Sequence, residues 1–169
     1  MSGGADAAGR ASATEIRVRY AETDAMGVVY YANYFVWFEL GRTDWIRMHG
    51  VTYREFEEQG ILLPVVDAQC AYKASARYDD LVRLETTVTA LTPARISFAY
   101  RATRADRPAP GAEPRATLLA EGRTDHVFVT RDGHVARLNR HPHLWRALAP
   151  AFAAARAGGP GAASAGESR

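Results

Sequence analysis

The feature that most constrains the fold is one long segment with a broad aromatic face at helical spacing. The apolar and small positions on this face are Tyr34, Trp37, Phe38, Gly41, Trp45 and Met48. Charged side chains fall mostly on the other positions, so the segment predicts an amphipathic helix that buries its aromatic face. A glycine inside a helix costs about 1 kcal/mol relative to alanine, and Gly41 therefore indicates close packing against a sheet. Gly50 is predicted to end the helix.

Most of the remaining chain shows the apolar alternation of strands. Strands are predicted over residues 15–20, 62–74, 81–91, 95–104, 115–130 and 134–138, the last after a turn at Asp132-Gly133. Thr52 and Glu55 form a capping-box pair, which predicts a short helix over residues 52–59. A terminal helix is predicted over residues 141–152, and the proline-rich loop 105–114 is expected to be exposed. One strand, one long helix and then antiparallel strands predict an α+β fold.

Length and composition indicate one folded domain between two tails. Residues 1–14 and 153–169 are rich in Gly, Ala and Ser and are predicted to be disordered, which leaves residues 15–152 as the domain. The net charge of +2 does not suggest nucleic-acid binding. No stretch is long and apolar enough to cross a bilayer, so no membrane insertion is expected.

Cys70 is the only cysteine, so no intramolecular disulfide can form. This fits a reducing compartment, and a cytoplasmic protein is expected. Cys70 lies in an apolar strand pattern without activating neighbours, which favours a buried structural thiol over a nucleophile. His126, His134, His141 and His143 do not combine with carboxylates or cysteines into a zinc-type set, so no metal site is expected.

The chemistry suggested by the sequence lies between the first strand and the long helix. A strand ends in a turn that holds Asp24, Gly27 follows, and an aromatic run opens the helix. This order puts a carboxylate beside a helix N-terminus, where free backbone N–H groups and the helix dipole favour developing negative charge. Such a pair suits hydrolysis of an activated acyl group. On the residues alone, an aspartate that only caps the turn is the simpler interpretation.

The motif consists of Asp24, Gly27, Val28, Val29, Tyr30, Tyr31, Ala32 and Asn33. Within the helix it is followed by the pattern Glu39-Leu40-Gly41-Arg42-Thr43. The run resembles the start of hotdog-fold acyl-CoA thioesterases of the 4-hydroxybenzoyl-CoA thioesterase and YbgC type, and the resemblance covers roughly residues 15–138. It implies a hotdog fold, in which an antiparallel sheet wraps around a long central helix. It also implies a homodimer or homotetramer with a shared active site, and no cofactor beyond the coenzyme A (CoA) of the substrate.

The resemblance also implies roles for individual residues. Asp24 would attack the thioester carbonyl or activate water, and the backbone N–H of Tyr31 would polarise the carbonyl oxygen. The implied substrate-binding residues are Gly27, Val29, Tyr30, Asn33, Ser75 and Arg95. Arg95 would meet a CoA phosphate, although Ala94 stands where the close relative has a second arginine. Asn33 either caps the helix or contacts the thioester.

Two other carboxylates compete with Asp24. Glu22 is interpreted as an exposed charge at the strand end, and Glu39 as a surface partner of Arg42 or Thr43 that serves as the reserve catalytic candidate. Tyr78-Asp79-Asp80 is interpreted as a structural turn.

Two alternative functions stay open. They are an enoyl-thioester hydratase, for which His49 lies too late in the helix, and a non-catalytic protein that binds acyl-CoA or an acyl carrier. The sequence does not identify the acyl group, because Tyr30, Tyr31, Tyr34 and Trp37 suit an aromatic or an aliphatic tail.

Overall fold

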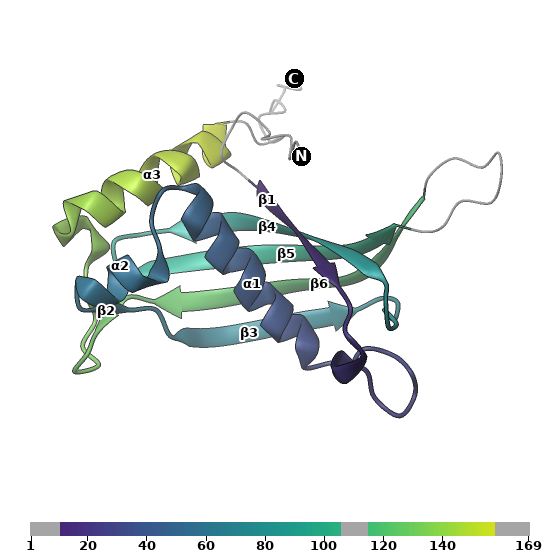
Figure 1. Ribbon diagram of the computed structural model, residues 1–169. Helices are drawn as coiled ribbons and strands as arrows, with labels where there is room; N and C mark the ends of the chain where they lie inside the picture. Colours follow the sequence, from purple (N-terminus) through teal and green to yellow (C-terminus); the bar gives the residue numbers. More distant parts are fainter. Residues whose placement is uncertain (1–10, 106–114, 158–169) are drawn as a thin grey trace, which may run out of the picture.

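A five-stranded antiparallel sheet curves around one long helix (Figure 1). The computed structural model describes residues 11–105 and 115–157. The sheet has the order β1-β4-β5-β6-β3 and is formed by β1 (Ala11–Arg17), β3 (Val65–Tyr72), β4 (Leu81–Leu91), β5 (Arg95–Ala105) and β6 (Ala116–Val127). Helix α1 (Asn33–Met48) lies across its concave face.

Further elements close one end of the molecule (Figure 1). They are α2 (Tyr53–Glu58), the two-stranded ribbon of β2 (Ile61–Leu62) and β7 (Val129–Thr130), a 3-10 turn (Leu138–Arg140) and α3 (Pro142–Ala157). The capping box of α2 is present, because the Thr52 side chain accepts the Glu55 N–H and the Glu55 side chain accepts the Thr52 N–H. Gly60 follows this helix with a left-handed φ of 74°.

The aromatic face of α1 forms the core, as its spacing predicts. Tyr34, Trp37, Phe38 and Trp45 are buried, whereas Met48 at the end of the helix is exposed. The ring of Phe38 stacks on Tyr100 of β5 at 4.3 Å between centroids. These contacts fix how α1 sits on the sheet, and so they fix where its N-terminus points.

Gly41 is the point of closest approach between helix and sheet. A Cβ built at Gly41 would collide with the Thr86 hydroxyl and would lie 2.7 Å from the Leu84 side chain, both on β4. The predicted reason for a glycine inside this helix is therefore confirmed. Gly122 of β6 plays the same part on the other side, because its Cβ would collide with the ring of Phe38.

Several predicted boundaries were wrong. β1 begins at Ala11, so residues 11–14 belong to the sheet and not to a tail, and α3 runs to Ala157 instead of ending at position 152. Residues 134–138 form only one isolated bridge, between Val129 and Val135, before the 3-10 turn begins. Residues 1–10, 106–114 and 158–169 lie outside the described residues, and the predictions for those parts of the tails and loop stay predictions.

Strand β3 is an edge of the sheet with apolar side chains beside it. It pairs with β6 on one side, and no described strand pairs with its other side. The exposed apolar residues on this strand are Val65, Val66 and Tyr72. Cys70 on the same strand is only half-buried, although burial still raises the pKa of its thiol. An unpaired edge with apolar residues is a surface on which another strand can pair.

Candidate active site

Asp24 lies in a tight turn that its own carboxylate helps to close. The Asp24 N–H donates to the Val28 carbonyl at 2.9 Å, and the Gly27 N–H donates to the Asp24 carbonyl at 2.9 Å. Gly27 has φ of 72°, a left-handed conformation that favours glycine. Asp24 Oδ1 accepts the Met26 N–H at 2.8 Å, while Oδ2 has no partner among the described residues. The residue therefore caps the turn with one oxygen and leaves the other available for chemistry.

Just before the start of α1, the chain presents a free backbone donor. Ala32 occupies the N-cap position and supplies no side-chain cap. Within the described part of the chain, the Tyr31 N–H has no acceptor, whereas its carbonyl accepts the Tyr72 hydroxyl at 3.0 Å. An unpaired N–H at a helix start carries partial positive charge and suits a carbonyl oxygen that gains negative charge.

A second loop, residues 73–80, packs against the Asp24 turn. The Val29 N–H donates to the Ala76 carbonyl at 2.9 Å. The hydroxyl of Tyr34, which is buried and has a raised pKa mainly because of that burial, also hydrogen-bonds the Ala76 backbone. Arg77 reaches across to the Gly27 carbonyl at 3.4 Å. The loop and the turn therefore form one continuous wall.

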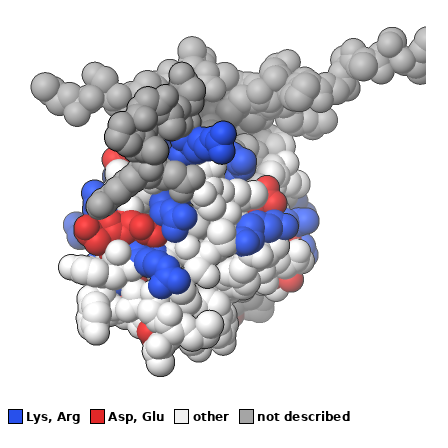
Figure 2. All heavy atoms as spheres, turned by 90° about the vertical axis from the view of Figure 1, so that its right-hand side faces the viewer, with Lys and Arg blue, Asp and Glu red and all other residues white. Residues whose placement is uncertain are grey.

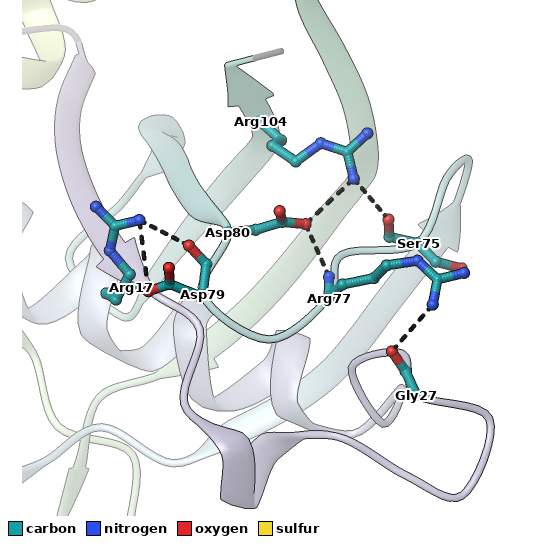
Figure 3. A network of polar contacts seen from close by, with 7 residues as sticks. All are labelled: Arg17, Gly27, Ser75, Arg77, Asp79, Asp80 and Arg104. Carbon is teal, nitrogen blue, oxygen red and sulfur yellow. Dashed lines mark hydrogen bonds and ion pairs between the residues drawn. The ribbon is translucent and has the colours of Figure 1, made fainter. Parts of the chain in front are cut away.

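A polar network holds this loop in shape (Figure 3). Asp80 Oδ2 accepts the Arg77 N–H at 2.8 Å and Arg104 Nη1 at 3.2 Å, and Arg104 also donates to the Ser75 carbonyl at 3.1 Å. Asp79 has φ of 67°, which is uncommon for a residue other than glycine. The Tyr-Asp-Asp segment is thus a structural turn, as predicted.

These segments enclose an open pocket of about 280 Å³. Its lining residues are Asp24, Val28, Val29, Tyr31, Tyr34, Tyr72, Lys73, Ala74 and Ser75. Three tyrosines form one wall, with Tyr72 packed edge-on against Tyr31 at 6.5 Å and against Tyr34 at 5.3 Å. One carboxylate, one free N–H beside the start of α1 and an aromatic wall therefore meet in one space. Viewed from this end of the molecule, Lys and Arg side chains lie on several sides of an uncharged area, with Asp and Glu side chains beside some of them (Figure 2).

Four of the candidate residues from the sequence line this pocket: Asp24, Val29, Tyr31 and Ser75. Tyr30 is exposed and packs against Tyr31 at 4.5 Å. Gly27 shapes the turn without lining the pocket. Tyr72, Lys73 and Ala74 were missed, although they directly precede Ser75 at the end of a predicted strand. Their position in the sequence was the available signal, because residues at the end of a strand lie at the same edge of the sheet as Ser75, which follows them.

Asn33 and Arg95 lie outside the pocket. The Asn33 side chain donates to the Glu22 carbonyl at 2.8 Å, so it neither caps the helix nor lines the pocket. Arg95 begins β5 beside the β4–β5 turn, whereas the pocket lies beyond the opposite ends of these strands, where Val82 pairs with Arg104. One chain therefore does not bring Arg95 and Asp24 together.

The prediction for Glu22 was wrong. Glu22 is buried, with 4% of its surface exposed, and it accepts hydrogen bonds from Arg19 and Trp37. Glu39 is exposed on α1, 3.9 Å from Arg42, and does not line the pocket. The surface pairing of Glu39 with Arg42 is therefore confirmed, and Asp24 is the carboxylate that lines this pocket.

Two of the histidines, His126 and His49, have local partners outside the pocket. His126 is buried between Thr124 and the Leu63 carbonyl, and burial followed by the nearby Arg42 charge lowers its pKa to about 4. The ring of His49 packs on Trp45 and bonds its carbonyl, away from the pocket. Among the described residues, no group of three or more His, Cys, Asp and Glu side chains could hold a metal ion. No described helix has the length and apolar character needed to span a membrane.

Comparison with known proteins finds relatives by sequence and by structure. YneP of Bacillus subtilis (strain 168) is 43% identical over 121 residues, which make up 72% of this chain and 81% of YneP. The acyl-CoA thioester hydrolase YbgC of Escherichia coli O157:H7 is 32% identical over 91 residues, or 54% of this chain and 68% of YbgC. The crystal structure of a DHNA-CoA thioesterase from Staphylococcus aureus has a TM-score of 0.78 and 34% identity, covering 89% of this chain and 96% of that chain.

A sheet curved around a central helix, with a carboxylate turn at the helix start, defines a hotdog-fold protein of the thioesterase kind. The family model described as the thioesterase-like superfamily matches residues 18–155. The chain belongs to this superfamily, and the fold implied by the sequence resemblance is confirmed.

Proposed function

We propose that this protein is an acyl-CoA thioesterase, which hydrolyses an acyl-CoA to free CoA and a carboxylic acid. The observation that carries the proposal is the pocket in which the Asp24 carboxylate and the unpaired Tyr31 N–H share a wall. The thioester carbonyl oxygen accepts the Tyr31 N–H, and Asp24 attacks the carbonyl carbon or takes a proton from the attacking water. The C–S bond breaks, and the sulfur leaves as CoA thiolate and is protonated. Where Asp24 is the attacking group, water then hydrolyses the mixed anhydride, which releases the carboxylic acid and restores the Asp24 carboxylate.

We further propose that the acyl group is aromatic. Tyr31, Tyr34 and Tyr72 supply an aromatic wall that can pack against a planar ring in edge or offset geometry. The name of the Staphylococcus aureus relative, a DHNA-CoA thioesterase, supports an acyl-CoA substrate for this site. The reaction as proposed uses no metal or prosthetic group, and the single cysteine supports a cytoplasmic location.

The test is a screen of thiol release from short-chain, long-chain and aryl acyl-CoAs, with and without EDTA. We expect kcat/KM to be at least about tenfold higher for the aryl substrates, a difference of about 1.4 kcal/mol in transition-state binding. EDTA is expected to change nothing. Release of thiol from none of the substrates would refute the thioesterase assignment, and a preference for aliphatic chains would refute only the aromatic one.

We also propose that the protein is a homodimer that pairs through β3. The Val65 end of this strand neighbours the β6 residue His126, which pairs with Ile96 beside Arg95. The Tyr72 end lies at the pocket. Antiparallel pairing of two β3 edges would therefore bring Arg95 of the partner subunit towards the Asp24 pocket, where its guanidinium could meet a CoA phosphate.

This arrangement predicts that Arg95 acts between subunits. Light scattering at micromolar concentration is expected to show at least twice the 18.5 kDa of one chain. Arg95→Ala is expected to raise KM about tenfold and to leave kcat unchanged, because a remote phosphate contact is equal in ground and transition states. A heterodimer of Asp24→Asn and Arg95→Ala subunits, isolated with two different tags, has one site with both residues intact. We expect it to show the wild-type KM at about half the wild-type kcat.

The control is the Arg95→Ala homodimer. If the heterodimer showed the same raised KM as this control, Arg95 would act within its own subunit. A monomer in light scattering that still hydrolysed acyl-CoA would refute the shared site altogether.

A further inference from the structure

Glu22 is a buried carboxylate that the reaction proposed above does not use. Its side chain is only 5% exposed, and an ionised group in such a place is costly unless it is paired and hydrogen-bonded. Burial alone would raise the pKa of Glu22. The hydrogen bonds from the Arg19 backbone, the Trp37 indole and the Arg19 guanidinium outweigh burial and hold this pKa below its ordinary value. The carboxylate is therefore charged at neutral pH.

The partners of this carboxylate come from two different elements. Oε2 accepts the Arg19 N–H at 2.8 Å, and Oε1 accepts Arg19 Nη2 at 3.1 Å and Trp37 Nε1 at 3.1 Å. Trp37 is fully buried on the aromatic face of α1. The bond to its indole thus ties the segment before the Asp24 turn to the buried face of α1.

The backbone carbonyl of Glu22 binds the other end of the same segment. It accepts the Tyr30 N–H at 2.9 Å and the Asn33 side-chain amide at 2.8 Å. Residues 23–32, which include Asp24 and Tyr31, therefore leave Glu22 and return to it. One residue fixes both ends of the segment that carries the carboxylate and the free N–H.

We propose that Glu22 is a positioning residue, which holds Asp24 and the Tyr31 N–H at their working separation. This inference rests on the proposed thioesterase function. Glu22 does not line the pocket, so it acts only through the segment it fixes. Misplacement of a reacting group by about 1 Å can cost about a hundredfold in rate. Loss of this anchor should therefore lower turnover without weakening substrate binding.

Glu22→Gln is the direct test. Glutamine keeps the size of the side chain but places an amide NH2 where a carboxylate oxygen accepts a hydrogen bond. We expect kcat for thiol release to fall about ten- to a hundredfold, with KM within about threefold of wild type. The matched control is Glu15→Gln, which removes the same charge from an exposed carboxylate on β1. It is expected to keep wild-type kcat and KM.

Hydrogen exchange measured by mass spectrometry supplies a readout that does not depend on activity. Peptides within residues 20–34 are expected to exchange faster in Glu22→Gln than in wild type, while peptides from β4 and β5 stay unchanged. A purely structural role would instead accelerate exchange across the whole core. Wild-type kcat, or unchanged exchange in residues 20–34, would overturn the proposal.

Two milder variants keep the proposal testable if Glu22→Gln does not fold. Trp37→Phe removes the indole donor to the carboxylate, and Asn33→Ala removes the amide donor to the carbonyl. Each is expected to lower kcat several-fold at unchanged KM and to accelerate exchange in residues 23–32. Wild-type kcat in both would refute the role of Glu22. If the wild-type protein hydrolysed no acyl-CoA, the proposed function would fail, and the exchange data alone would decide whether Glu22 anchors the segment.

Discussion

Asp24→Asn is expected to reduce kcat for thioester hydrolysis by about 10²–10⁴-fold, the range attributed to a positioned general base. The amide keeps the size of the side chain, and its oxygen can still accept the Met26 N–H that closes the turn. It lacks the charge needed to attack the carbonyl or to take a proton from water. Stopped-time assays of thiol release across a range of substrate concentrations would give kcat and KM separately, and KM is expected to change little.

Glu39→Gln is the matched control, since it removes a carboxylate that is exposed on the same helix and lies outside the pocket. It should retain wild-type turnover, and circular dichroism should show both variants folded. A loss of less than tenfold in Asp24→Asn corresponds to under about 1.4 kcal/mol, too little for the central group. That result, together with a large loss in Glu39→Gln, would move the catalytic carboxylate to the helix.

Gly41→Val is expected to lower the free energy of unfolding by about 3 kcal/mol, at the upper end of the cost of overpacking a core. A Cβ at this position already collides with the Thr86 hydroxyl and approaches the Leu84 side chain, and valine adds two further methyl groups. The helix and the sheet would have to separate at their closest point. Thermal unfolding followed by circular dichroism is expected to show Tm lower by about 10 °C for a domain of this size.

Thr86→Ala provides the companion variant. The Thr86 hydroxyl is buried with no hydrogen-bond partner among the described residues, so its removal costs no hydrogen bond. The Gly41→Val/Thr86→Ala double variant should lose less free energy of unfolding than the two single variants lose together, because the second change makes room for the first. Additive effects, or a Gly41→Val protein with wild-type Tm, would show that helix and sheet do not meet closely at this point.

Local patterns were sufficient for the elements whose signals lie within a few residues. The strand predicted over residues 81–91 is β4 without correction. The capping box of Thr52 and Glu55 starts α2, and the aromatic spacing from Tyr34 onward marks the buried face of α1. These features depend on backbone geometry and on side chains one turn apart, so the sequence contains them directly.

Residues 134–138 were predicted as a strand because the Asp132-Gly133 turn was correctly recognised. Gly133 does adopt φ of 80°, as such a turn requires. Pairing stops after one bridge, since the chain turns into a 3-10 turn whose Leu138 is buried in the core. Burial of one leucine overrode the local strand pattern, and that competition is not visible in the segment itself.

The sequence alone determined the helix with its aromatic face, the need for glycine at position 41, and the turn that places Asp24 before a helix start. Each follows from periodicity or turn chemistry over a short stretch of chain. Only the tertiary structure decided that Glu22 is a buried anchor. Its partner Trp37 lies 15 residues further along the chain, and a glutamate without a visible partner normally favours solvent. The tertiary structure also placed Tyr72 in the pocket and Arg95 at the far end of the sheet. Such positions depend on which strands pair and in what register, and long-range packing sets both.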